Sequence, residues 1–535
     1  MKNIRAKEHG SSPGESCHEL ITAMLEPEFY PKPPSEVIHK ETHISDVFLA
    51  GDLVYKVKRP VRFSFLDYST LAKRRHFLHE ELRLNRRLAP SVYLAIVPIA
   101  NDGKDWQLGG EGKPIEYALV MRRLPEKRFL SFLLETHQVT PAMMTELAEL
   151  LARFHSQAEK VQRINGADYV EAVKSQWSEN LADFEPFLGK LIDSETFDML
   201  KDFGARFIER HRDLLMRRVV DGWIREVHGD LHCEHVCFAP DGIQIFDCIE
   251  FSAKLRQCDL ASEIAFLTMD LEARGGGSLV GGFLGRYGAL LGDPDLLELL
   301  PFYKCYRALV RCKVNALRSH EADSTAAHYC RFAIRYTWEP LKPFLVIIGG
   351  LTGSGKSVLA RELGERLGMP VINSDTVRKA MAGRSGPELA RFNEGIYSPG
   401  ATEKTYAKMA REAEKQISSG TGAILDATFG QRAHREKIQR LAERHRVPLA
   451  VIICSASEET TKARLAQRAA AGKDISDGRW EIYLEQKPAY EPVVEIPPAS
   501  FLEMNTERPL GEITRACERF LRSRLQVFNP QDPRS

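Results

Sequence analysis

The residues best suited to chemistry form a glycine-rich stretch that ends in lysine and serine. Its members are Gly350, Leu351, Thr352, Gly353, Ser354, Gly355, Lys356 and Ser357. They fit the pattern Gly-x4-Gly-Lys-Ser/Thr, in which glycines let consecutive backbone N–H groups point at an anion without obstruction by a Cβ. The spacing predicts a nucleotide-phosphate loop, in which Lys356 reaches the β- and γ-phosphates and Ser357 offers its hydroxyl to Mg²⁺.

Two aspartates follow apolar runs further along the chain. Asp375 comes after residues 370–373, and Asp426 comes after residues 423–425. A carboxylate at the carboxyl end of a parallel strand opens into the ligand crevice of the sheet. We therefore expect Asp375 to accept the proton of an attacking hydroxyl and Asp426 to hold Mg²⁺. The alternative for each aspartate is a helix cap or a turn residue.

Arg464 and Arg468 add positive charge in the same half of the chain. Their i, i+4 spacing places them on one face of a predicted helix, ahead of the polar segment 471–479. A lid of this kind could bring guanidinium groups onto a transferring phosphoryl group and exclude water. The alternative is a solvated basic face on an exposed helix.

A second group of polar residues lies in the first half of the chain. Residues 228–235 read His-Gly-Asp-Leu-His-Cys-Glu-His, and the apolar run 243–246 leads into Asp247. A loop carboxylate followed by another at the end of a short hairpin suits phosphoryl transfer. Asp230 would orient or deprotonate a hydroxyl, and Asp247 would hold Mg²⁺. We expect His228 to brace the loop through backbone hydrogen bonds rather than to act as a base.

A lysine on an alternating strand could complete this second site. Lys56 can pair with α- and β-phosphates, and a helical acid, Glu81 or its neighbour Glu80, can hold the lysine in place. Lys58 shares a face of the strand with Lys56, so both lysines stay open as candidates.

The same half contains side chains that could suggest a zinc site. They are His232, Cys233, His235 and Cys237. Their spacing matches no common structural-zinc pattern, and neighbouring side chains on an extended loop point apart. We therefore favour packing of the two cysteines in the loop over metal binding.

The elements that position these residues change in character along the chain. Residues 1–34 contain turn-forming and proline-rich stretches and are predicted to be flexible. A strand-rich lobe follows, and then helices that continue to about residue 338. In the lobe we expect strands at 51–58, 96–99 and 117–124 and a helix at 70–88. Among the later helices we expect short strands near 226–228 and 243–246. One of these helices is expected to be capped by Thr140, with Pro141 in its first turn.

Beyond Pro343 the pattern alternates between strands and helices. We expect strands at 344–348, 370–373, 422–425 and 449–454. Alternation of this kind predicts a parallel sheet flanked by helices.

Bulk composition restricts the class of protein. A length of 535 residues suits two to four domains, and 43% apolar with 27% charged residues is typical of a soluble globular chain. The net charge of +1 gives no reason to expect nonspecific nucleic-acid binding. No apolar run approaches the roughly 18 residues that span a bilayer. The 10 cysteines lack a disulfide rhythm, so we expect a cytoplasmic protein without a membrane partner.

Residues 344–525 resemble the small P-loop kinases of the polynucleotide-kinase, gluconate-kinase and zeta-toxin type. The resemblance rests on residues 350–357, 373–379 and 425–429 and on the spacing of the two arginines, Arg464 and Arg468. It implies ATP, Mg²⁺ and a small-molecule hydroxyl acceptor close to Asp375.

Residues 35–335 are similar to the aminoglycoside-phosphotransferase branch of the protein-kinase-like fold, through His-Gly-Asp-Leu-His and Phe246-Asp247-x-x-Glu250. That family usually has an asparagine where this chain has His235. Asparagine offers a hard oxygen to Mg²⁺, whereas imidazole prefers softer or transition metals. We assign His235 to the metal site. The alternatives are that the first half of the chain uses one metal ion, uses a different ion, or has lost catalysis.

Together the two halves resemble the bifunctional aminoglycoside phosphotransferase/ATP-binding proteins of bacteria. The resemblance implies a bilobal kinase-like domain at 35–340 and a P-loop kinase domain at 341–535, after the flexible segment. It implies ATP-dependent phosphoryl transfer to a small-molecule hydroxyl by both domains. Two alternatives remain. Only the second half is catalytic, on a nucleotide or nucleic-acid 5′-hydroxyl, or the first half is a ligand sensor coupled to a nucleotide-dependent switch.

Overall fold

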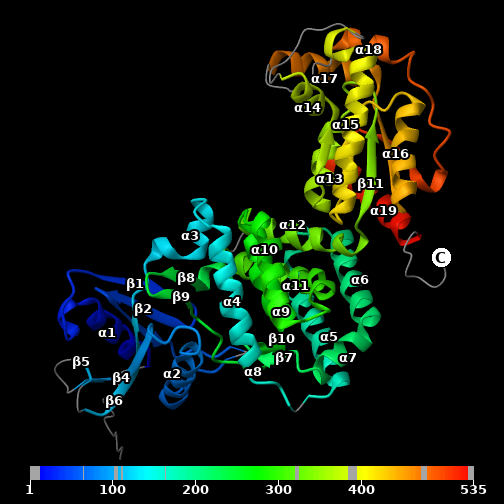
Figure 1. Cartoon of the computed structure of the whole chain (residues 1–535). Helices are drawn as coiled ribbons and strands as arrows, with labels where there is room; N and C mark the ends of the chain where they lie inside the picture. Colours follow the sequence, from blue (N-terminus) through cyan, green and yellow to red (C-terminus); the bar gives the residue numbers. More distant parts are fainter. Residues whose placement is uncertain are drawn as a thin grey trace, which may run out of the picture. The chain divides into compact units, whose positions relative to one another are not determined.

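The chain folds into two compact units, Met1–Cys330 and Arg331–Ser535 (Figure 1). The structure is a computed structural model, and it describes residues 13–63, 66–101, 106–109, 112–162, 164–319, 324–383, 394–471 and 479–527. Among these residues no helix combines the length and apolar character that a bilayer span requires.

The first unit begins with a lobe built on a six-stranded antiparallel sheet. Its strands lie in the order β1-β2-β3-β6-β4-β5. Their bounds are β1 (Val37–Glu41), β2 (Ser45–Ala50), β3 (Leu53–Lys58), β4 (Tyr93–Asn101), β5 (Trp106–Leu108) and β6 (Pro114–Arg122). On β3, Tyr55 and Val57 face a core shared with helix α1 (Pro13–Leu25). Strand alternation therefore places Lys56 and Lys58 on the opposite face of the sheet.

Helix α1 differs from the predicted flexible segment. Leu20 and Met24, one turn apart, are buried against the sheet together with Tyr30, whose hydroxyl donates to the Met24 carbonyl at 2.6 Å. The apolar spacing that drives this packing follows directly after a Gly-, Ser- and Pro-rich stretch, which concealed it. Residues 1–12 lie outside the described part of the chain.

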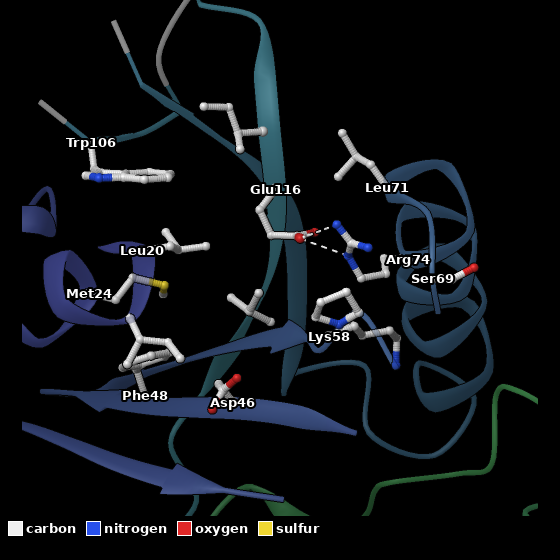
Figure 2. A pocket seen from close by; sticks show the side chains of 14 residues that line it. Leu20, Met24, Asp46, Phe48, Lys58, Ser69, Leu71, Arg74, Trp106 and Glu116 are labelled. Atoms are coloured by element: carbon white, nitrogen blue, oxygen red, sulfur yellow. Dashed lines mark hydrogen bonds and ion pairs between the residues drawn. The ribbon is translucent and has the colours of Figure 1, made fainter. Parts of the chain in front are cut away.

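A cavity of about 250 Å³ lies between α1, the sheet and the start of helix α2 (Leu71–Asn85) (Figure 2). Trp106 and Phe48 contribute to its apolar wall, and the ion pair between Arg74 and Glu116 lies at its charged end. Arg74 Nε and Nη2 are 2.8 and 2.7 Å from Glu116 Oε2. Because Arg74 is on α2 and Glu116 is on β6, the pair fixes the helix that carries Glu81 against the sheet.

The second lobe of this unit is helical, with two small two-stranded sheets. Its longer helices are α4 (Pro141–Gln157), α5 (Gly166–Ala182), α6 (Ser194–Arg210), α7 (Arg212–Val220), α9 (Leu260–Ala273), α10 (Gly277–Leu291), α11 (Leu296–Ser319) and α12 (Ser324–Tyr336). The short strands are β7 (Ile224–Glu226) paired with β10 (Gln257–Asp259), and β8 (Val236–Ala239) paired with β9 (Gly242–Ile245). The predicted cap of α4 is confirmed, since the Thr140 side chain accepts from the Met143 N–H.

Helix α9 is buried on all sides from residue 260 to 271, yet it contains Glu263 and Asp270. Both carboxylates accept hydrogen bonds from the backbone of loop 228–235. Glu263 takes the His228 N–H at 2.8 Å, and Asp270 takes the Cys233 N–H at 3.0 Å. The buried acids therefore fix the backbone of the loop that presents Asp230.

Arg218 on α7 is fully buried between two acids, and we expect it to dominate the stability of this lobe. Its Nη2 lies 2.6 Å from Asp259 Oδ1 and 2.8 Å from Asp293 Oδ2. Arg218→Met should lower the free energy of unfolding by about 3–5 kcal/mol, because two buried carboxylates lose their counter-charge. Urea-dependent hydrogen exchange of α7 and α9 peptides in the full chain measures this unit specifically.

The neighbouring residue supplies the control for that substitution. Arg217 also binds an aspartate, Asp295, at 3.2 Å, but its side chain is 56% exposed. Arg217→Met should change stability by at most about 1 kcal/mol. Equal effects of the two substitutions would contradict the role of the buried pair.

The second unit is built on a five-stranded parallel sheet in the order β12-β13-β11-β14-β15. The strands are β11 (Phe344–Gly349), β12 (Val371–Asn373), β13 (Gly422–Asp426), β14 (Leu449–Ser455) and β15 (Phe501–Asn505). Its helices include α13 (Lys356–Leu367), α14 (Ser374–Met381), α15 (Pro399–Ser418), α16 (Arg432–His445), α17 (Glu458–Ala471), α18 (Trp480–Gln486) and α19 (Leu510–Val527). The four predicted strands are present, and β15 was not predicted.

Both faces of this sheet are covered. One apolar cluster joins Leu345 and Ile347 to α15 and α16, and another joins Val346 and Ile348 to α13 and α19. Strands buried on both faces are nearly continuous apolar runs, which is why β11, β13 and β14 were predictable. All five carboxyl ends lie at one edge of the sheet, where residues 350–357, Asp375 and Asp426 follow them.

Candidate active sites

The glycine-rich loop connects the end of β11 to the start of α13. Gly350, Gly353 and Gly355 have φ angles of 136°, 77° and 85°, which L side chains rarely adopt. A Cβ on Gly350 would lie 2.4 Å from the Cys454 carbonyl oxygen. The loop conformation therefore requires glycine at these positions. In the described part of the chain, the N–H groups of Gly350, Thr352 and Ser354 already donate to protein oxygens. The N–H groups of Gly353, Gly355 and Lys356 are the ones left to face an anion.

Lys356 is the first residue of α13, and Ser357 follows it, both half-buried. In the described part of the chain, Lys356 has no carboxylate within ion-pair distance. The ammonium group and the hydroxyl are thus placed at the helix N-terminus without a protein partner that competes for phosphate or cation.

Arg464 contacts this loop through Thr506. Its Nη1 donates to Thr506 Oγ1 at 2.9 Å and its Nη2 to the Thr506 carbonyl at 2.7 Å, and Thr506 Oγ1 donates to the Ser354 carbonyl at 2.6 Å. Arg468 lies one turn further along α17 and is half-buried. Neither arginine is on a fully solvated face. Of the predicted lid loop, residues 471–479, the part from 472 to 478 lies outside the described residues.

Asp375 and Asp426 are brought to the same edge of the sheet. The cap of α14 is Asn373, whose Oδ1 accepts the Thr376 N–H, so the helix-cap alternative for Asp375 is wrong. Asp375 instead accepts from Arg378 Nη1 at 2.9 Å. Asn373 Nδ2 donates to Asp426 Oδ2 at 2.7 Å, while Asp426 Oδ1 is buried with no partner among the described residues. An orphaned buried carboxylate oxygen suits a bound divalent cation or its water.

A cavity of about 310 Å³ opens between the glycine-rich loop and α14. Lys356, Asp375 and Arg378 line it, together with residues that no motif indicated. These are Tyr397, Thr402, Glu403, Tyr406, Gln431, His434, Gln486 and Tyr490 among others. They come from three separate stretches, 397–406, 431–434 and 486–490. Their individual surroundings in the sequence carry no signal, so sequence reasoning missed them.

The far wall of this cavity pairs aromatic rings with charges. Arg378 stacks over the Tyr397 ring at 4.5 Å from its centroid, and His434 stacks on Tyr406 with ring centroids 3.8 Å apart. His434 Nε2 lies 2.7 Å from Glu403 Oε1. Burial lowers the pKa of His434 more than Glu403 raises it. The wall therefore offers a neutral imidazole beside two carboxylates and one guanidinium group.

In the first unit, Lys56 forms the centre of a charged network. Its Nζ lies 2.8 Å from Glu81 Oε1 and 2.9 Å from Asp247 Oδ1. Lys58 lies deeper, with its Nζ 2.7 Å from Glu81 Oε2 and 2.5 Å from Glu250 Oε1. Glu81 thus holds both lysines, and Lys56 is the one that reaches Asp247. The alternative acid, Glu80, pairs with Arg83 on the surface.

Burial and charge act in opposite directions on this network. Burial lowers the pKa of Lys56, but Asp247 and Glu81 more than compensate, so the net pKa is well above its ordinary value. Burial raises the pKa of Asp247, while Lys56 and then His235 lower it to well below its usual range. Lysine and carboxylate are therefore both ionised at neutral pH.

Hydrogen bonds to Phe246 and Glu263 hold loop 228–235 in place, and His228 takes part in them as predicted. His228 Nε2 lies 2.9 Å from the Phe246 carbonyl, and Gly229, with φ of 84°, donates its N–H to Glu263 at 3.1 Å. Burial raises the pKa of Glu263 to about 7, and the two backbone N–H groups oppose that rise. Asp230 is presented on this rigid loop with its side chain 35% exposed.

Asp230 lies beside two imidazoles. Its Oδ2 is 3.6 Å from His232 Nε2 and 3.7 Å from His235 Nδ1, and His235 Nε2 is 3.6 Å from Asp247 Oδ2. Ligand atoms of Asp230, His232 and His235 all lie within 4.8 Å of one another. Cys233 and Cys237 are buried and do not join this group. Burial raises the pKa of Asp230, but the histidines, His232 first, bring it far below its usual range.

Comparison with protein families assigns both units. Residues 50–300 match the phosphotransferase enzyme family, and residues 345–493 match an AAA domain. "Uncharacterized protein Rv2004c" of Mycobacterium tuberculosis is 32% identical over 443 residues, which cover 82% of this chain and 87% of that protein. The chain belongs to the same family. A Mycobacterium bovis protein, "Uncharacterized protein Mb2027c", matches with the same identity and coverage.

Matches to other proteins are shorter or more distant. A shikimate kinase of Paramagnetospirillum magneticum is 27% identical over 163 residues, which are 30% of this chain and 81% of that protein. A gluconokinase from Sinorhizobium meliloti aligns with 35% of this chain and 98% of its own length, with 18% identity and a TM-score of 0.26. The Mycobacterium tuberculosis APS kinase in complex with AMPPNP and APS aligns with 34% of this chain and 98% of its own length, at the same identity and TM-score.

The family assignment settles the class of protein. The predicted fold is confirmed, with a kinase-like phosphotransferase unit and a P-loop kinase unit on a parallel sheet flanked by helices. Both units belong to kinase or phosphotransferase families, so the chain is a phosphotransferase. The roles of individual residues stay predictions.

Proposed function

We propose that the chain contains two ATP-dependent kinase sites, one in residues 35–340 and one in residues 341–535. Both require a divalent cation, which is Mg²⁺ in the second site. Each transfers the γ-phosphoryl group to a hydroxyl of a small molecule. The observation that supports this most strongly is the glycine-rich loop at residues 350–355, which opens onto a cavity lined by Lys356 and Asp375. A phosphate grip and a carboxylate facing the same cavity are the parts that phosphoryl transfer to a hydroxyl needs.

In the second unit, Lys356 and the backbone N–H groups of the loop bind the β- and γ-phosphates. Ser357 and Asp426 would hold Mg²⁺, which would supply positive charge to the phosphates; the orphaned Asp426 Oδ1 fits this role. Asp375 orients the acceptor hydroxyl and takes its proton as the bond to phosphorus forms. Arg464 and Arg468 stabilise charge on the transferring group, with Arg464 aimed at the loop by Thr506.

In the first unit, Lys56 binds the α- and β-phosphates and Glu81 keeps it in position. Asp247 contributes carboxylate oxygen to the bound cation. Asp230 acts mainly by orienting the acceptor hydroxyl, because a carboxylate whose pKa lies far below 7 is a weak base. It receives the hydroxyl proton only late in the reaction.

The acceptor of the second unit is proposed to be small, polar and hydroxylated. Its cavity of about 310 Å³ has the size of a small-molecule site. The wall alternates acid and base through Asp375, Arg378 and Glu403, which favours a ligand with several hydrogen-bonding groups over an apolar one. The nine cysteines whose side chains the structure describes are free thiols, in keeping with a cytoplasmic site of action.

Transfer of ³²P from labelled ATP to a panel of sugars, sugar acids, polyols and nucleosides tests this proposal in the full chain. We expect acceptor-dependent labelling by at least one unit, with Mg²⁺ or Mn²⁺ present. ATP binding by calorimetry is measured alongside. Binding of no nucleotide by either unit would reject the proposal, whatever the panel shows.

A further inference from the structure

His235 is held in a single tautomer by the backbone. Its Nδ1 lies 2.8 Å from the Asp230 carbonyl oxygen, which can only accept a hydrogen bond, so Nδ1 carries the proton. Nε2 of the neutral ring is then a free lone pair. A backbone carbonyl on one ring nitrogen, with the other nitrogen left bare, is the arrangement found at metal-ligating histidines.

The bare nitrogen faces a carboxylate oxygen at a distance suited to a shared cation. His235 Nε2 is 3.6 Å from Asp247 Oδ2, which is beyond hydrogen-bond range. Two ligand atoms on one ion, each about 2.1 Å from it at angles of roughly 90–120°, lie about 3.0–3.6 Å apart. Asp247 Oδ1 is occupied by Lys56, so Oδ2 is the oxygen left to bind.

The backbone of Asp247 adopts an uncommon conformation that its surroundings maintain. Asp247 has φ of 64°, a left-handed conformation uncommon outside glycine, and its N–H donates to the Tyr93 hydroxyl at 3.0 Å. Strained backbone that surrounding contacts maintain is typical of functional positions. Its side chain is 43% exposed and that of His235 is 13% exposed, so an ion can reach both groups.

This donor set does not fit Mg²⁺ well. Mg²⁺ requires hard oxygen ligands, whereas imidazole nitrogen is a good ligand for first-row transition cations. We infer that the first unit binds a first-row transition cation, with His235 Nε2 and Asp247 Oδ2 as its protein ligands, in preference to Mg²⁺. The inference rests on the proposed function, because the remaining ligands are nucleotide phosphate oxygens and water.

The neighbouring trio of Asp230, His232 and His235 is a less suitable site. The His235 nitrogen that lies 3.7 Å from the Asp230 carboxylate is Nδ1, and that nitrogen already donates to the Asp230 carbonyl. His232 Nε2 accepts from Arg311 Nη1 at 3.4 Å, which places a guanidinium charge where the cation would lie. The pair of His235 and Asp247 has neither conflict.

Manganese is the probe, because it takes both oxygen and nitrogen ligands and is paramagnetic. The full chain carries Lys356→Ala, so that nucleotide-bound metal in the second unit does not contribute. The nucleotide is the methylene analogue AMP-PCP, which has no nitrogen between its phosphates. Pulsed electron paramagnetic resonance of the bound Mn²⁺ detects ¹⁴N of a ligating imidazole, and ¹⁵N-histidine labelling identifies that nitrogen as histidine.

We expect ¹⁴N modulation in the chain with His235 intact and its loss in His235→Asn. Competition titration should show the preference for Mn²⁺ over Mg²⁺ falling by about tenfold or more, since asparagine restores an oxygen ligand. His434→Asn, in the other unit, is the matched control and should change neither result. Circular dichroism and the thermal midpoint check folding, and the spectrum with His235 intact decides the question even if His235→Asn does not fold.

Three outcomes would overturn the inference. They are bound Mn²⁺ without histidine nitrogen coupling, coupling that survives His235→Asn, and an unchanged Mn²⁺ to Mg²⁺ preference in that variant. AMP-PCP binding is followed separately by calorimetry. If nucleotide binds but no nitrogen couples, only this inference fails. If no nucleotide binds to the first unit, the proposed function of that unit fails as well.

Discussion

Replacing Lys356 with alanine should abolish nucleotide turnover by the second unit, with a loss of about 10²–10³-fold or more in ATP consumption. In the described part of the chain its ammonium has no carboxylate partner, so phosphate is the group left to neutralise it. The loop glycines supply N–H dipoles but no full charge. Removing the one lysine at the start of α13 therefore leaves the γ-phosphate without a cationic side chain at that end.

The measurement uses a full chain whose first unit is silenced by Asp230→Asn, so that turnover reports the second unit alone. Lys404→Ala is the matched control, because Lys404 is exposed on α15 in the same unit. It should leave turnover and the thermal midpoint unchanged. Undiminished turnover by Lys356→Ala, in protein with an unchanged midpoint, would remove the glycine-rich loop from the mechanism.

Local patterns were enough to predict the parts of each site that lie close together in sequence. The conformation of residues 350–357 follows from their own sequence. The glycines at positions with positive φ and the helix that follows are both visible in the pattern. Asp375 and Asp426 were predictable because each lies at or just beyond the carboxyl end of a short apolar run, and parallel strands end at one edge of the sheet. The fold class follows from the same alternation.

Contacts between distant segments could not be predicted in this way. Lys56 and Lys58 lie on the same face of β3, and only the positions of Asp247 and Glu250 separate their roles. The cavity wall around Glu403 and His434 is assembled from helices that sequence does not align in space. Helix α1 escaped prediction because its apolar face is short and follows a polar stretch.

His235 illustrates both limits. The sequence shows a histidine where the resembling family usually has asparagine, and this difference raises the question of which metal ion the first unit binds. The answer depends on which ring nitrogen is free, and that is decided by the carbonyl of Asp230 five residues away. Loop 228–235 folds back on itself over buried Glu263 and Asp270, so the contact has no periodic signature in the chain.

Asp230→Asn should reduce phosphoryl transfer by the first unit about 10²–10⁴-fold while leaving the fold intact. Asparagine has the same shape, and the Asp230 backbone carbonyl still accepts from His235, so the loop keeps its bracing. What is lost is the negative charge that orients an acceptor hydroxyl and receives its proton late in the reaction. Nucleotide binding should change little, because the substitution leaves Lys56 and Asp247, the groups proposed to bind phosphate and cation, and their ion pair in place.

Transfer is measured in a Lys356→Ala background, so that the second unit does not contribute to the signal. Asp241→Asn is the control, since Asp241 is exposed in the turn between β8 and β9 and binds the surface groups of Arg122 and Ser91. It should keep full activity. A large loss in Asp230→Asn with unchanged nucleotide affinity separates a catalytic carboxylate from a structural one, because a structural role would also lower affinity and the thermal midpoint. Undiminished transfer would contradict a catalytic role for Asp230, whereas nucleotide binding without transfer to any acceptor would assign the first unit to ligand sensing.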